Sequence, residues 1–187
     1  MTWQWRNTAE RWGSVAKAFH WTVVVLILLQ FWLAREAEAL PLGMAKLAAF
    51  ARHKSFGITI LALASLRLLW RLCQRNSPPL PGDLKPYERL LARVTHVGLY
   101  VLLFAMPLSG WAMSSARNYP VSWFSLVALP DLVGPDEQLF TALRFTHGVL
   151  ALALLALAAL HVLGALQHHF IRKDGVLRRM LPFAGPR

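Results

Sequence analysis

An uninterrupted apolar stretch near the carboxyl end of the chain is bounded by two histidines, His147 and His161. No polar side chain interrupts residues 148–160, and a helix that is apolar on every side belongs inside a membrane. The fourteen residues from one histidine to the other rise about 21 Å on a helix and end about 40° short of whole turns. Both rings therefore leave the same face of one membrane-spanning helix. Because imidazoles inside a bilayer are costly, this placement indicates a functional role.

Four apolar runs of this kind divide the chain and predict an all-α, integral membrane four-helix bundle. Each run approaches or exceeds the roughly 20 residues that cross the hydrocarbon core. Hydrophobic residues make up 56% of the chain and the mean hydropathy is +0.43, which favours a single membrane domain over residues 1–187. The expected spans are about residues 16–35, 53–73, 91–114 and 140–168.

The chain has a net charge of +11, and the distribution of its Lys and Arg residues predicts the orientation of the protein in the membrane. Fourteen of the twenty basic residues lie before or at the start of the first span, from the end of the second span to the start of the third, or after the fourth. An excess of Lys and Arg marks the cytoplasmic side of a membrane protein, so both termini are expected in the cytoplasm and no nucleic-acid partner is expected. The single cysteine, Cys73, excludes an internal disulfide and the Cys-x-x-Cys-His attachment of c-type haem. The amino-terminal region lacks the pattern of a cleaved signal peptide.

Four histidines pair by depth in this topology. His53 and His147 open the second and fourth spans near the outer face. His20 opens the first span and His161 lies toward the end of the fourth, so both are near the inner face. Since a bis-histidine haem takes one axial ligand from each side of its ring, and facing helices of a bundle can supply them, the pattern predicts two haem b groups. A helix capped by Ser14 would bring His20 level with His161.

The histidines also have other interpretations. They could be buried or interfacial side chains that hydrogen-bond to carbonyl groups, or they could hold zinc or copper. Zinc prefers four ligands, commonly including Cys or carboxylates, whereas each depth offers about two histidines and no acid. His96 opens the third span near the inner face and could replace His20, support the ligands or contact a quinone. His168 and His169 are expected at the membrane edge, and whether they contact a cofactor stays open.

Two arginines are placed near the inner pair. Arg67 lies fourteen residues after His53, on the same helix face at the inner depth, and Arg71 follows one turn later. Their guanidinium groups could pair with haem propionates, or they could snorkel to the membrane surface. No Asp or Glu falls within the four predicted spans. Because proton pumps and ion-coupled carriers usually place carboxylates in the membrane, the pattern favours electron transfer.

Short motifs recur in a characteristic order along nearly the whole chain. They are Ala-Phe-His-Trp at residues 18–21, Arg-His-Lys-Ser-Phe-Gly at 52–57, Leu-Arg-Leu-Leu-Trp-Arg at 66–71, Thr-His-Val-Gly-Leu-Tyr at 95–100, Pro-Leu-Ser-Gly-Trp at 107–111, Asn-Tyr-Pro-Val-Ser-Trp-Phe at 118–124, Thr-His-Gly at 146–148 and the segment 160–180. No single motif is specific, but their order and spacing together are. The chain resembles the bacterial di-haem cytochrome b561 family, which is related to the cytochrome b subunits of hydrogenases and formate dehydrogenases.

The resemblance implies a ligand set and a location. In that family the first, second and fourth helices supply the axial ligands, which implies His20 with His161 for the inner haem iron and His53 with His147 for the outer one. It also implies a multi-pass protein of the bacterial inner membrane.

The short form of the chain most resembles the superoxide oxidase members of that family. This implies a superoxide:ubiquinone oxidoreductase, which takes electrons from superoxide at the periplasmic face and passes them to ubiquinone. The outer basic residues Arg52, Lys54, Arg117 and Arg144 could attract a small anion, or they could pair with propionates and lipid phosphates.

Two other functions stay open from the sequence. One is a cytochrome b subunit that passes electrons between a periplasmic dehydrogenase partner and the quinone pool. The other, from a different class, is a non-redox carrier of a metal or small molecule.

Overall fold

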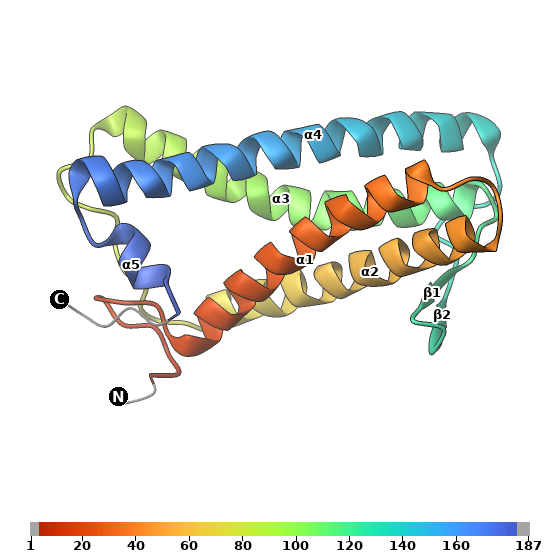
Figure 1. Cartoon of the computed structure of the whole chain (residues 1–187). Helices are drawn as coiled ribbons and strands as arrows, with labels where there is room; N and C mark the ends of the chain where they lie inside the picture. The colour runs from red at the N-terminus through yellow and green to blue at the C-terminus, as the bar shows by residue number, and fades with distance from the viewer. Residues whose placement is uncertain (1–3, 183–187) are drawn as a thin grey trace. The chain divides into compact units, whose positions relative to one another are not determined.

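The computed structural model describes residues 4–182, and helices dominate this part of the chain (Figure 1). Arg187, one of the basic residues counted after the fourth span, lies outside the described residues. In chain order the elements are α1 (Ser14–Ala39), α2 (Met44–Leu72), α3 (Pro86–Ala116), β1 (Val121–Trp123), β2 (Val127–Leu129), α4 (Glu137–Gln167), the π-helical turn η1 (His168–Arg172) and α5 (Val176–Met180).

The helices α1, α2, α3 and α4 are long and apolar enough to cross a membrane, the last of them together with η1. In the most apolar stretch of each of these helices, only 6% to 17% of the residues are buried within the protein. The remaining apolar side chains are available to contact lipid, which is the arrangement that a membrane-spanning helix requires. The predicted all-α membrane fold is therefore confirmed.

Each long helix begins before its predicted apolar span, and polar residues cap the starts of two of them, α3 and α4. Pro86 opens α3, where its missing N–H is tolerated, and Glu88 Oε2 accepts a hydrogen bond of 2.8 Å from the Lys85 backbone N–H. At the start of α4, Asp136 Oδ1 accepts a hydrogen bond of 2.9 Å from the Leu139 N–H, as an N-cap does.

Two expectations about helix starts need correction. The helix α1 begins at Ser14, but the Ser14 hydroxyl donates to the Gln4 carbonyl at 3.1 Å instead of capping a helical N–H. Ser14 thus fastens the amino-terminal segment to the start of α1. The helix α2 begins at Met44, so His53 lies well inside that helix and not at its start.

The chain forms two compact units, and each takes a segment from all four long helices. The first unit comprises residues 1–22, 65–100 and 154–187, and the second comprises residues 23–64 and 101–153. In the second unit, Val23, Ile60, Ala64 and Leu103 form a buried apolar cluster.

A small β-hairpin between α3 and α4 was not predicted from the sequence. Its strands β1 and β2 pair antiparallel. The hairpin is fastened to α2 within the second unit, since Ser55 Oγ accepts a hydrogen bond of 3.0 Å from the Phe124 N–H. In addition, Trp123 Nε1 donates to Thr59 Oγ1 at 3.0 Å.

The segment that follows α4 is held to the first unit by hydrogen bonds and ion pairs. Lys17 Nζ donates to the Leu181 carbonyl and Trp21 Nε1 to the Met180 carbonyl, each at 2.9 Å. Arg172 contacts two acids, with Nη2 at 2.6 Å from Asp83 Oδ2 and Nη1 at 3.1 Å from Glu88 Oε2.

The Arg172–Asp83 contact gives a pH-dependent prediction. The hydrogen bond from Arg172 holds the pKa of Asp83 below its ordinary value of 3.8. A carboxyl group whose pKa is lower in the folded state contributes stability above its unfolded pKa and loses it as the pH falls through its folded pKa. We expect Asp83→Asn to lower the melting temperature slightly at pH 7, because the pair is exposed. The difference should shrink in acid, as the pH falls toward the lowered pKa of Asp83.

The measurement is tryptophan fluorescence during thermal unfolding at pH 7 and at about pH 3, below the ordinary pKa of an aspartate. The control is Asp131→Asn, which removes another exposed acid that has no hydrogen-bond partner among residues 4–182. An equal effect of the two substitutions at pH 7 would contradict the prediction.

Candidate functional site

The first unit brings three histidines from three helices together. His20 of α1 and His161 of α4 have ring centroids 6.1 Å apart with an interplanar angle of 65°. His96 of α3 lies 5.1 Å from His161, centroid to centroid. His20 and His161 are half-buried, whereas His96 is exposed. We call these three residues the first histidine cluster.

The centroid separation of His20 and His161 fits ligation of a single metal ion. Two imidazoles that would bind one iron from its two sides, through nitrogens about 2 Å away, would place their centroids about 6 Å apart. The 6.1 Å separation matches this value, and the 5.1 Å between His96 and His161 falls short of it. The pair expected from depth is therefore also the pair with the suitable separation.

Two arginines and a tyrosine accompany the first histidine cluster. The guanidinium carbons of Arg67 and Arg71 lie 5.3 Å and 5.5 Å from the centroid of the Tyr100 ring, within the range of cation–π attraction. Arg67 Nη2 also lies 3.3 Å from His20 Nδ1. Neither guanidinium group has a carboxylate partner among residues 4–182. Both are therefore available to pair with haem propionates.

The Arg67 contact has a consequence for His20. Arginine only donates hydrogen bonds, so His20 Nδ1 accepts in this contact and the ring proton lies on Nε2. If His20 held an iron through Nε2, the ring proton would lie on Nδ1 and the contact with Arg67 would be lost. The Arg67 guanidinium would then be free to pair with an anion.

His53 of α2 and His147 of α4 lie in the second unit, close enough to interact electrostatically. The tautomer of His147 is set by Ser109. Ser109 Oγ donates to the Met106 carbonyl at 2.9 Å, so it can only accept from His147 Nδ1, also at 2.9 Å. The proton of His147 therefore lies on Nδ1, and its Nε2 lone pair is available to a metal.

The His53 ring is less constrained than that of His147. Its Nδ1 is buried and has no hydrogen-bond partner among the described residues. Gln30 of α1 donates from Nε2 to the backbone carbonyl of His53 at 3.0 Å, and Gln30 Oε1 is likewise buried without a partner. Gln30 thus holds the backbone of α2 at this histidine.

The two histidine sets fit a haem better than a bare metal ion. Among residues 4–182 no three His, Cys, Asp or Glu side chains form a group that could hold a metal ion. Each unit instead offers histidines from different helices, which is what an iron already held by a porphyrin needs.

Comparison with known proteins identifies the family. The model of the family described as prokaryotic cytochrome b561 matches residues 11–183. The chain belongs to this family. Its membership shows a multi-pass bacterial membrane protein that carries electrons, and it implies binding of haem b. The alternative of a non-redox carrier is thereby excluded.

Similar proteins cover nearly the whole chain. Cytochrome b561 homolog 2 of Escherichia coli (strain K12) is 37% identical over 186 residues, which are 94% of this chain and 93% of that protein. The probable superoxide oxidase CybB of Yersinia pestis is 30% identical over 173 residues, covering 92% and 97% of the two chains. Cytochrome b561 homolog 1 of Escherichia coli (strain K12) is 25% identical over 174 residues, covering 92% and 98%.

Of the four bases that the sequence predicts at the outer face of this cytochrome b561, three have partners within the protein. Arg52 pairs with Glu36 at 3.3 Å, Arg117 pairs with Glu137, and Lys54 Nζ donates to the Pro120 carbonyl at 2.9 Å. Arg144 has no hydrogen-bond or ion-pair partner among residues 4–182. Because pairing with an acid cancels the field of a base, Arg52 and Arg117 add little attraction for a small anion.

The two histidines after α4 are placed in the turn η1. His168 Nδ1 lies 2.5 Å from Asp174 Oδ2, and the His169 ring contacts Phe170 edge to face with centroids 4.8 Å apart. No ring contact in the described part of the chain joins either of them to the first histidine cluster.

Gly110 of α3 gives a prediction about the packing of His147. A Cβ atom at position 110 would lie 3.1 Å from His147 Cε1, which is tighter than an ordinary contact. We expect Gly110→Ala to displace the ring, to perturb the haem spectrum if His147 is a ligand, and to cost roughly 1–3 kcal/mol in overpacking.

The measurement is the reduced-minus-oxidised spectrum together with the melting temperature. Gly164→Ala is the matched control, because a Cβ atom there meets nothing within 4 Å and both changes raise helix propensity equally. Identical spectra and melting temperatures for the two variants would contradict the prediction.

Proposed function

We propose that this cytochrome b561 carries electrons from superoxide at the periplasmic face of the bacterial inner membrane to ubiquinone, using two b-type haems. The observation that supports the number of haems is that each compact unit contains its own set of histidines. The name of the Yersinia pestis relative supports the choice of superoxide. The distribution of Lys and Arg supports an orientation with both termini in the cytoplasm.

The proposed ligands are His20 with His161 in the first unit and His53 with His147 in the second. In this assignment Ser109 fixes the tautomer of His147, and it raises the basicity of the nitrogen that faces the metal.

Arg67 and Arg71 supply positive charge for propionates in the first unit. His96 lies beside His161 as a neighbour and is not a proposed ligand. The Ala92 carbonyl, 2.6 Å from His96 Nδ1, holds the His96 ring in this place. These contacts are made by the protein alone, so they position the histidine rings before electron transfer begins.

When bound, haem iron supplies one-electron redox chemistry, which the protein positions and tunes. Two histidines at each iron leave no position open for oxygen, so the residues favour electron transfer over oxygen binding. The overall reaction balances as two superoxide anions oxidised to two O₂, while one ubiquinone takes two electrons and two protons to become ubiquinol.

The test is stopped-flow mixing of the oxidised, detergent-purified protein with superoxide. We expect rapid growth of the reduced b-type α-band, and ubiquinol formation when ubiquinone is included. Superoxide dismutase added beforehand should abolish the signal. A haem-loaded protein whose spectrum does not respond to superoxide would overturn this proposal.

A second candidate, the electron-transfer subunit of a periplasmic dehydrogenase, is favoured by the β-hairpin. Apolar side chains at and next to its turn are exposed, with Leu126 at 76% and Val127 at 51% of their full accessible surface. Exposed apolar side chains that lie together mark interaction sites. Reduction of the haems by a co-purifying dehydrogenase, with no response to superoxide, would favour this second function.

A further inference from the structure

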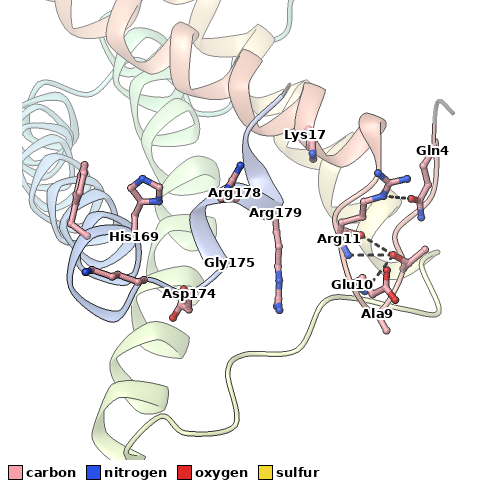
Figure 2. A pocket seen from close by; sticks show the side chains of 13 residues that line it. Gln4, Ala9, Glu10, Arg11, Lys17, His169, Asp174, Gly175, Arg178 and Arg179 are labelled. Atoms are coloured by element: carbon pink, nitrogen blue, oxygen red, sulfur yellow. Dashed lines mark hydrogen bonds between the residues drawn. The ribbon is translucent and has the colours of Figure 1, made fainter. Parts of the chain in front are cut away.

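A cavity of about 980 Å³ lies in the first unit, between residues 4–17 and residues 169–179. Figure 2 shows the two walls, with Gln4, Arg11 and Lys17 on one side and His169 and Asp174 on the other, while Arg178 and Arg179 lie between them. The histidines of the first cluster do not line this cavity. It is therefore separate from the proposed haem site.

The lining of the cavity is strongly basic. Only two acids line it, Glu10 and Asp174. The basic side chains in the lining are Arg11, Lys17, His169, Lys173, Arg178 and Arg179. The Asp174 carboxylate is already engaged, since it contacts His168 Nδ1 at 2.5 Å and accepts a hydrogen bond from the Val176 N–H at 3.0 Å.

The five Lys and Arg side chains of this lining lack the carboxylate partners that other bases have. Lys17 and Arg179 donate only to backbone carbonyls, those of Leu181 and Pro79, and Arg11 donates to the Gln4 side-chain amide. The side chains of Lys173 and Arg178 have no hydrogen-bond or ion-pair partner among residues 4–182.

None of the five forms an ion pair with a carboxylate, whereas Arg52, Arg117 and Arg172 elsewhere in the described chain each do. Arg11, Lys17, Arg178 and Arg179 are all partly buried, and the charges of Arg11 and Lys17 interact. Like charges gathered in a partly buried cavity repel each other unless an anion neutralises them. The cavity therefore has the charge of an anion site.

The position of the cavity indicates which anion it receives. It lies where α1 begins and where the membrane helix α4 with η1 ends, the level at which the phosphates of a bilayer lie. Phe170, at its edge, is 66% exposed, and the neighbouring Ile171 is 76% exposed. A phosphate in the cavity would thus have apolar surface beside it for acyl chains, and basic pockets at the ends of membrane helices bind such headgroups.

We propose that this cavity binds the phosphate of an anionic phospholipid headgroup. Arg11, Lys17, Lys173, Arg178 and Arg179 provide the positive charge. Arginine can contact the phosphate oxygens with two parallel hydrogen bonds. A bound headgroup would bridge the amino-terminal segment and the segment around α5, which are otherwise joined through carbonyl groups of residues 180 and 181.

The test is native mass spectrometry of the delipidated, haem-loaded protein with added phosphatidylglycerol, cardiolipin or phosphatidylcholine. We expect one tightly held anionic lipid per chain, with phosphatidylcholine bound at least about tenfold more weakly, because the contacts depend on net negative charge. The same anionic lipid should raise the melting temperature in tryptophan fluorescence.

The variant K173Q/R178Q removes two charges that make no contact among the described residues, so the fold should be unaffected. We expect anionic-lipid affinity to fall about tenfold or more, with an unchanged haem spectrum. The matched control R75Q/R144Q removes two exposed arginines that have no partner among residues 4–182 and do not line the cavity, and it should retain the affinity.

Three outcomes would overturn the proposal. The first is equal binding of phosphatidylcholine and phosphatidylglycerol. The second is an equal loss of affinity in the two double variants, which indicates only a general charge effect. The third is binding of inorganic phosphate or glycerol phosphate as tightly as the lipid, which assigns the cavity to a soluble phosphate compound.

Discussion

The His147→Ala variant is expected to lose one of the two proposed haems and to keep the other. His147 is the histidine whose Nε2 is most clearly prepared for a metal, because Ser109 and the Met106 carbonyl hold its proton on Nδ1. Alanine removes the ligand, and His53 alone offers only one axial bond. The pyridine haemochrome count should fall by about half, while the spectrum of the remaining haem persists.

The control for this prediction is Phe145→Ala on the same helix. Phe145 is 75% exposed and faces away from the protein, so its removal should leave both haems in place. If His147→Ala kept its full haem content, the ligand assignment in the second unit would be wrong. Loss of both haems in a folded protein would contradict the independence of the two sites.

Ser109→Ala separates ligation from positioning. The substitution leaves the His147 ring in place but removes the acceptor that fixes its tautomer. We expect the haem to be retained with a higher midpoint potential or an altered α-band, since loss of the acceptor behind Nδ1 lowers the basicity of the ligand and partners behind a ligand tune the metal. A redox titration measures this change, and an unchanged potential would show that the Ser109 contact has no influence on the iron.

The membrane helices could be predicted from the sequence because their signal is long and local. Residues 148–160 are apolar throughout, and no soluble helix needs this on every face. The helix starts could not be placed as well, because they depend on side-chain hydrogen bonds such as those of Glu88 and Asp136, which lie outside the apolar runs. The hairpin was missed because strands of three residues leave almost no periodic pattern.

The histidines of the site could be found from the sequence, but the residues that hold them could not. Ser109 and Gly110 reach His147 only through the packing of α3 against α4, and no spacing along the chain reveals a contact between helices. Tyr100 carried a usable signal, since it lies four residues after His96 and therefore on the same helix face. The pairing of the outer bases with Glu36 and Glu137 likewise depends on tertiary contacts.

A comparison of His20→Ala with His96→Ala decides which histidine partners His161. We expect His20→Ala to lose one haem and His96→Ala to keep both, because the 6.1 Å centroid separation suits two imidazoles on opposite sides of one iron and 5.1 Å is too short for it. Val97→Ala, at an exposed neighbour of His96, is the control for α3.

A third variant, Arg67→Gln, tests the role of Arg67 beside His20. If His20 binds iron through Nε2, Arg67 cannot keep its contact with His20 Nδ1 and must turn to an anionic partner. Arg67→Gln should then retain the haem and shift its midpoint potential. The potential would rise if the main effect were lost packing around a propionate. It would fall if the main effect were the loss of positive charge. We expect the downward shift, because removing a cation near the iron destabilises the electron-rich ferrous state. Retention of haem by His20→Ala together with its loss in His96→Ala would transfer the ligand role to His96, whose Nδ1 is already held by the Ala92 carbonyl. An unchanged midpoint potential in Arg67→Gln would mean that the contact between Arg67 and His20 persists in the haem-loaded protein.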